Sequence, residues 1–220
     1  MSDKVMNKIK NGREYRTMMV EPVEGVTDQV VEGYATTFNQ PYNLYSFEDE
    51  RGKHTVREQV DANAFKDADM SDVIMQYDHA GRVFARISNG TLGLEEDEHG
   101  LKIRANLSGT EIGRQLYEEI QGGYTNKMSF GFTVAEDNIV PDGTDYLRTI
   151  VRIGKLFDVS AVSLPANDFT EISARSHCDG AIAEIEAERL RAEKEAEEQR
   201  QRLEEIQNRL KALKGDKHGN

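Results

Sequence analysis

The chain has 220 residues, which is enough for one globular domain with an appendage or for two small domains. With 28 Lys and Arg residues against 40 Asp and Glu residues it carries a formal net charge of −12, and because phosphate backbones repel such a chain, the composition argues against nucleic-acid binding. No apolar run approaches the ~20 residues of a membrane helix, and the N-terminus lacks the apolar stretch of a secretory signal. The single cysteine, Cys178, excludes zinc fingers and paired redox cysteines. We therefore expect a soluble protein without metal or membrane partners.

Composition divides the chain into four parts. Residues 1–12 are polar, and we expect a flexible N-terminus. Residues 13–176 mix short β-like runs with turns rich in Gly, Asn and Asp, which predicts a folded domain. Residues 179–214 are rich in Ala, Glu, Arg, Lys, Gln and Leu and predict one long helix, and residues 215–220 are expected to form a disordered tail.

The folded part is predicted to be mainly β. Two further features are a turn expected within the last strand segment, near Gly154, and a short helix expected at 62–68. Because strands outnumber helices and do not alternate with them, we expect an α+β fold of the mainly β kind, a compact β-barrel or sandwich with peripheral helices. The candidate strands, in chain order, are 16–23, 29–38, 72–80, 82–88, 91–107 with a turn in its middle, 126–137 and 146–164.

One helix within this part has clear end signals. Residues 108–111, Ser-Gly-Thr-Glu, match a capping box, and the helix after them carries Ile112, Leu116 and Ile120 at four-residue spacing before Gly122 ends it. No glycine-rich phosphate loop of either common type occurs in the sequence, so nucleotide binding lacks its main support.

The C-terminal helix carries a heptad seam. The seam positions near both ends of the helix are apolar, whereas Arg189 and Gln199 place polar side chains in the middle of the seam and weaken it there. A helix from 182 to 213 is roughly 48 Å long at 1.5 Å per residue. We expect a coiled coil that binds a partner or another copy of this chain, and the alternative is a single solvated helix held by its own ion pairs. The seam positions are Ile182, Ile185, Arg189, Ala192, Ala196, Gln199, Leu203, Ile206, Leu210 and Leu213.

Few residues of the folded part are candidates for chemistry. Among the five histidines only His79 ends an apolar strand segment, VIMQYDHA. On a strand it would share a face with Val73, Met75 and Tyr77 and emerge where that face meets a loop. A histidine there can act as a general base near neutral pH, and the alternative is a partly buried histidine bonded to backbone.

Ser129 and Asp158 are the other two candidates. Ser129 lies in the strand segment KMSFGF, where Gly131 bares the backbone on the same face and would let a substrate chain approach; the alternative is a small residue on a crowded strand. Asp158 is one acid in an otherwise apolar strand and needs a buried partner. Either a histidine or a structural arginine meets that need.

Seven segments together resemble the prohead proteases of tailed bacteriophages, which are serine peptidases that mature procapsids. The resemblance covers roughly residues 28 to 175 and is most specific in the order of the DH pair, the MSFGF strand and the last segment. It implies a fold similar to the herpesvirus assemblins, a compact β-barrel ringed by helices. The segments are GYATTF (33–38), NAF (63–65), DH (78–79), EDEHGL (96–101), LSGTEIG (107–113), NKMSFGF (126–132) and FDVSAVSLPANDFTEI (157–172).

The resemblance assigns roles to the three candidates. His79 corresponds to the catalytic histidine and Ser129 to the nucleophile. Asp158 stands where the phage pattern has an acid, whereas assemblins use a second histidine as third member; His177 lies past the motif. The sequence departs from the family where ARIS (85–88) stands in place of a frequent glycine.

The implied activity is that of a serine endopeptidase. It would cleave scaffold or capsid-protein segments, and itself, during procapsid maturation, inside the immature procapsid in the host cytoplasm, with no cofactor and no metal. Its partners would be the major capsid protein and the scaffold protein. The alternative is a non-enzymatic assembly protein that keeps an inert protease-like body and uses the C-terminal coil.

Overall fold

The computed structural model describes residues 13–25, 28–163 and 169–215. The chain forms two units, residues 1–176 and 177–220, which are described separately. The predicted flexible N-terminus, 1–12, lies outside the described residues, and so does the predicted tail, 215–220, apart from Gly215.

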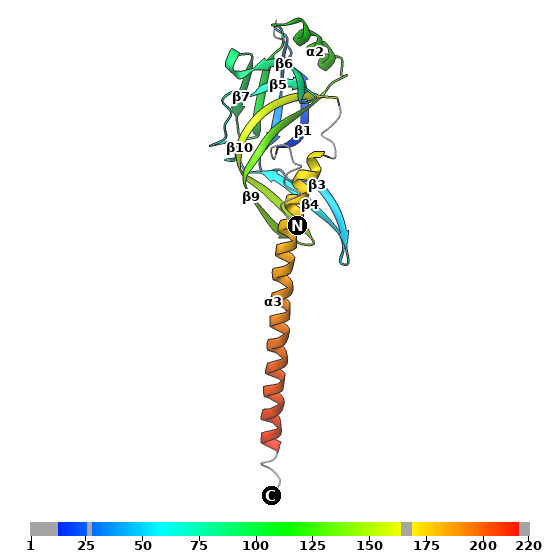
Figure 1. The fold of residues 1–220 in the computed structure, drawn as a ribbon, viewed down its shortest axis with the longest axis vertical. Helices are drawn as coiled ribbons and strands as arrows, with labels where there is room; N and C mark the ends of the chain where they lie inside the picture. Colours follow the sequence, from blue (N-terminus) through cyan, green and yellow to red (C-terminus); the bar gives the residue numbers. More distant parts are fainter. Residues whose placement is uncertain (1–12, 26–27, 164–168, 216–220) are drawn as a thin grey trace. The chain divides into compact units, whose positions relative to one another are not determined.

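The first unit is built on a ten-stranded sheet (Figure 1). Eight strands follow one another in the order β3-β4-β10-β9-β1-β2-β8-β7 and curl into a half-barrel. The remaining two form a hairpin in which β5 pairs in parallel with β10. The strands are β1 (Arg13–Pro22), β2 (Val30–Thr37), β3 (Tyr42–Asp49), β4 (Gly52–Val60), β5 (Ile74–Tyr77), β6 (Ala80–Arg86), β7 (Leu92–Glu96), β8 (Gly100–Asn106), β9 (Lys127–Asp142) and β10 (Asp145–Val162).

The prediction of a mainly β fold with a peripheral helix and a long C-terminal helix is confirmed, the barrel being a curled half-barrel. The turn expected near Gly154 is wrong, because β10 runs unbroken and stays paired with β9 through small register shifts. The helix expected at 62–68 is also wrong. Hydrogen bonds from Ala64 to Asp61 and from Ala68 to Phe65 make a series of tight turns there instead.

The helix α2 (Glu111–Gln121) forms where it was expected, but its cap differs. The N-cap is Thr110, whose hydroxyl accepts a hydrogen bond from the Gly113 amide at 3.0 Å. Ser108, the expected cap, instead donates to Asn106 at 2.6 Å. Leu116 and Ile120 are buried on the inner face, as the spacing predicts. A short 3-10 turn, η2 (Ile87–Asn89), is the other peripheral helical element described.

The β3–β4 hairpin was not predicted, because its inward positions carry polar residues. In β4 the buried positions include His54 and Glu58 where an amphipathic strand has apolar side chains. The His54 ring contacts the Thr144 carbonyl through Nδ1 and Asp49 through Nε2, at 2.8 Å for the second contact. Two acceptors favour the doubly protonated ring, so the hydrogen bond to Thr144 and then Asp49 raise the pKa of His54.

Glu58 belongs to a buried cluster of charges beside the apolar core. Arg16 donates to it at 2.6 Å, and Arg148 donates to Glu58 and Glu14 at 2.8 Å and to Asp137 at 2.6 Å. Burial opposes ionisation of both groups, yet the Glu58 carboxylate raises the pKa of Arg16 and the Arg16 guanidinium lowers the pKa of Glu58. The cluster therefore stays ionised and ties β1, β4, β9 and β10 together.

The long helix α3 runs from Phe169 to Gly215, so it begins ten residues before the predicted helix. In the second unit Cys178 and Ile182 are buried, whereas Leu203 and Ile206 of the heptad seam are more than half exposed. The exposed seam fits either alternative, and the coiled coil stays a prediction. Within the part of the chain that the structure describes, no helix is long and apolar enough to cross a membrane.

Candidate active site

His79 lies in the tight turn of the β5–β6 hairpin, two residues beyond the end of β5, so the strand predicted over 72–80 is too long and His79 is not on it. Tyr77 pairs with Ala80, so Asp78 and His79 form a two-residue loop, and both have positive φ, 46° and 56°. Such a turn requires positive φ at both positions and usually holds Asn or Gly. Asp78 secures it, because its amide donates to the Ala161 carbonyl and its carboxylate accepts from the Ser163 amide, each at 2.9 Å. The strained turn thus fixes where the imidazole stands beside β10.

Asp158 is the partner of His79. Its Oδ1 lies 2.5 Å from His79 Nδ1, and the Ser160 hydroxyl donates to the same oxygen at 2.6 Å. Asp158 and Ser160 are both buried. Of the two partners that the sequence allowed for this acid, the histidine is the one observed. These two contacts satisfy the carboxylate oxygen in a place where water does not reach it.

Ser129 lies on β9, one strand away from this pair. The registers of β1, β9 and β10 place Thr17, Ser129 and Ser160 in one row across the sheet. The next row on the same face, two residues along each strand, holds Tyr15, Gly131 and Asp158. Residues opposite each other in adjacent strands share a face, so the Ser129 side chain points to the side of the sheet that carries Asp158.

Gly131 has a different role from the one expected. A Cβ added to it would lie 2.6 Å from Asp158 Oδ2 and 2.8 Å from Tyr15 Cε1. The space over Gly131 is therefore filled by the Asp158 carboxylate and the Tyr15 ring. The prediction that this space admits a substrate chain is wrong. The Tyr15 ring in turn packs against the His79 ring, with centroids 4.2 Å apart. Glycine is needed here so that the acid and the aromatic ring can stand side by side.

Two polar atoms at this site are buried without a hydrogen-bond partner among the described residues. They are Ser129 Oγ and His79 Nε2. A buried polar atom without a partner is costly and calls for an explanation. These are the two atoms that a serine nucleophile and its histidine base must bring together.

Sequence reasoning missed two residues of this site. Ser160 and Tyr15 contact Asp158 and His79, but only the strand register brings them there. His177, the other possible third member, is an exposed residue of α3 in the second unit. Across the described ranges, no group of His, Cys, Asp and Glu residues is arranged to hold a metal ion.

Comparison with known proteins identifies the family. The model of the family described as Caudovirus prohead serine protease matches residues 14–181. The chain belongs to this prohead serine protease family. The match spans both strands that carry Ser129 and Asp158 and the turn that carries His79. A search of curated proteins found no match, and a search of solved structures found none either.

Proposed function

We propose that this prohead serine protease uses Ser129, His79 and Asp158 to cleave peptide bonds in procapsid proteins. The observation that carries the proposal is the 2.5 Å contact between His79 Nδ1 and Asp158 Oδ1, beside a buried serine without a partner. Membership of the family supports the reaction class. The residues are proposed from their geometry and from the family resemblance.

We infer the tautomer of His79 from this hydrogen bond. An ionised carboxylate only accepts, so the proton between the two atoms belongs to Nδ1. In the neutral ring the other nitrogen, Nε2, is then the acceptor. His79 is thereby held in the tautomer that can take the proton from Ser129 Oγ.

The reaction then follows the serine-peptidase course. Ser129 Oγ attacks the substrate carbonyl while its proton passes to His79 Nε2, and Asp158 stabilises the imidazolium that forms. His79 returns the proton to the leaving amine, and a water molecule activated in the same way hydrolyses the acyl-enzyme. Backbone N–H groups serve as donors to the oxyanion.

Access to the nucleophile requires a local movement. Ser129 has no exposed surface, and His79 Nε2 is buried as well. A peptide carbonyl must come within about 3 to 3.5 Å of the attacking oxygen. The groups that cover Oγ therefore have to move aside when substrate binds, which makes the conformation described here a closed one.

The substrates we propose are segments of the scaffold protein and the major capsid protein, and this chain itself. The family membership supports procapsid proteins as the class. The place of action would be the immature procapsid in the host cytoplasm. We also propose that the seam of α3, whose Leu203 and Ile206 are exposed and so available to a partner, binds scaffold or a second copy of the chain and thereby delivers the protease.

Co-expression tests this function against the alternative of an inert assembly protein. The chain is produced together with the capsid and scaffold proteins encoded beside it, and the N-termini of all products are sequenced. New N-termini that appear with the wild type and with Ser46→Ala, an exposed serine of β3, but not with Ser129→Ala support an active peptidase. Intact partners with the wild type, or new N-termini that persist in Ser129→Ala, contradict it.

A further inference from the structure

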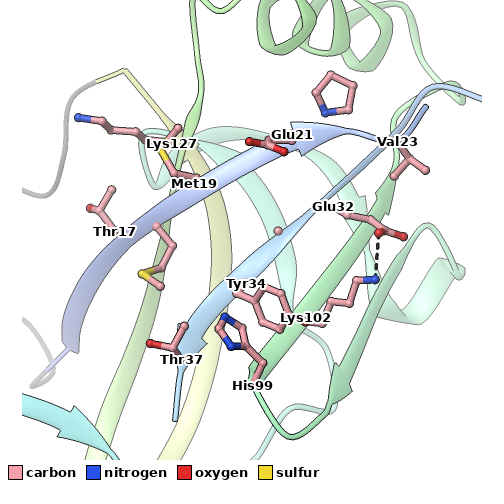
Figure 2. Close-up of a pocket in the computed structure, with 13 residues that line it drawn as sticks. Thr17, Met19, Glu21, Val23, Glu32, Tyr34, Thr37, His99, Lys102 and Lys127 are labelled. Atoms are coloured by element: carbon pink, nitrogen blue, oxygen red, sulfur yellow. Dashed lines mark ion pairs between the residues drawn. The ribbon is translucent and has the colours of Figure 1, made fainter. Parts of the chain in front are cut away.

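A pocket of about 750 Å³ opens on the sheet beside the candidate active site (Figure 2). It is lined from β1, β2 and β8 and by Lys127 of β9, and the proposed mechanism makes no use of it. The residues that decide its character are Thr17, Met19, Tyr34, His99, Lys102 and Lys127.

The pocket is on the same face of the sheet as the nucleophile. Thr17, which lines it, is directly opposite Ser129, and Lys127, which also lines it, precedes Ser129 by two residues on the same strand. Met19 is opposite Lys127 in turn. Residues in these relations share a face. A chain whose carbonyl reaches Ser129 can therefore continue over the pocket.

The charged groups around the pocket are matched by one another. Lys102 lies 3.0 Å from Glu32, and the Tyr34 hydroxyl donates to Asp97 at 2.7 Å. The Tyr34 ring packs edge-on against His99 at 4.5 Å. Arg104 also pairs with Glu32, so the two cations, Lys102 and Arg104, balance the two carboxylates, Glu32 and Asp97, and the floor carries no net charge.

The remaining surface is apolar. Met19 is 52% exposed although it is a large apolar side chain, and Pro22 and Val23 extend the same wall. At the rim Glu21 and Lys127 carry opposite charges, so they favour neither sign of ligand. An exposed methionine suits aliphatic side chains of differing shape, because its thioether adapts to them.

We propose that this pocket binds an aliphatic side chain of the substrate polypeptide and so determines where the protease cuts. The inference rests on the proposed function of Ser129. Neighbouring strands are about 4.8 Å apart and an extended chain advances about 3.3 Å per residue. Met19, which supplies the apolar wall, lies one strand across from Ser129 and two residues along. The side chain it holds is thus about two or three residues from the scissile bond.

The topology supports recognition through side chains. β1 is paired with both β9 and β2, and β2 with both β1 and β8, so a substrate cannot add a strand at this place. Selection must come from what fits the pocket. A substrate side chain that lacks one methylene group which such a pocket would hold loses about 1 to 3 kcal/mol of transition-state binding. That loss lowers kcat/KM roughly 10- to 200-fold.

The test combines two measurements. The first is a cleavage profile over a random peptide mixture, read by mass spectrometry, and the second is the rate at which a small fluorophosphonate labels Ser129. The wild type is expected to select Leu, Ile, Val or Met at one position two or three residues from the cut. Met19→Glu should lower kcat/KM for the best peptide at least about tenfold more than it lowers labelling. Val140→Glu, which changes an exposed apolar residue at the far end of β9, is the matched control and should leave both rates unchanged.

Two results overturn the inference. One is a wild-type profile without an aliphatic preference at that distance, and the other is an unchanged profile in Met19→Glu. Should Met19→Glu not fold, Met19→Trp takes its place, because filling the pocket is expected to shift selection toward smaller side chains. Absence of labelling in the wild type is a different result, since it contradicts the assignment of Ser129 and not the pocket.

Discussion

Gly131→Ala tests whether the acid, the histidine and the tyrosine form one packed unit. The new Cβ would lie 2.6 Å from Asp158 Oδ2, and ordinary contacts begin at 3.4 Å, so the carboxylate has to move by about 0.8 Å. A shift of this size lengthens or breaks the 2.5 Å contact with His79. The backbone of Gly131 is outside the left-handed region, so alanine introduces no backbone strain.

The expected cost follows from the size of the shift. Misplacing a catalytic group by about 1 Å lowers the rate roughly 10²-fold. The assay is the second-order rate of fluorophosphonate labelling, with thermal unfolding measured to confirm the fold. Gly93→Ala is the control, because its Cβ would meet nothing closer than 3.8 Å and its rate should equal that of the wild type. A folded Gly131→Ala that is labelled as fast as the wild type would refute the packed arrangement.

Three further outcomes are expected. Ser160→Ala removes a hydrogen-bond donor to Asp158 and should lower kcat roughly tenfold with KM unchanged. Ser160→Thr keeps the hydroxyl and should retain the wild-type kcat. An equal loss of kcat in both variants would argue that Ser160 has only a structural role. Because the folded pKa of His54 is raised, its stabilising contribution is complete below the unfolded value of about 6.5 and is lost as pH rises through the folded value. The thermal midpoint of the wild type should exceed that of His54→Gln most at low pH, and a gap that widens with pH would contradict this. A chain ending at Leu190 keeps the buried residues of α3, so a fluorophosphonate should label its Ser129 at the wild-type rate. It should fail to co-purify with procapsids. Normal entry of this shortened chain into procapsids would contradict the proposal that the coil delivers the protease.

The sequence named candidate site residues, but it did not reveal what surrounds them. His79, Ser129 and Asp158 stand in short segments whose order resembles the family, so single residues could be named. Their supporting contacts depend on strand register, which no local pattern reports. Tyr15 and Ser160 are 145 residues apart in the chain, yet successive rows on one face of the sheet bring them to the same site.

The unpredicted parts of the fold have a common physical cause. Periodicity identifies a strand by the apolar side chains on one face. In β4 the inward positions of His54 and Glu58 are satisfied by Asp49, Arg16 and other polar groups, so the alternation is hidden. In β10 the glycine at position 154 predicts a turn, whereas long-range pairing with β9 keeps the strand continuous.

The most direct measurement of the central claim is active-site labelling across a double-mutant cycle. The full chain is treated with a fluorophosphonate, and the modified residue is located by peptide mass spectrometry in the wild type, Ser129→Ala, His79→Ala and the double variant. Members of a catalytic unit act together, so the double variant should be little slower than either single variant. We expect a single adduct on Ser129 that is nearly abolished in His79→Ala. An adduct on another residue, or undiminished labelling of Ser129 in a folded His79→Ala, would contradict the account.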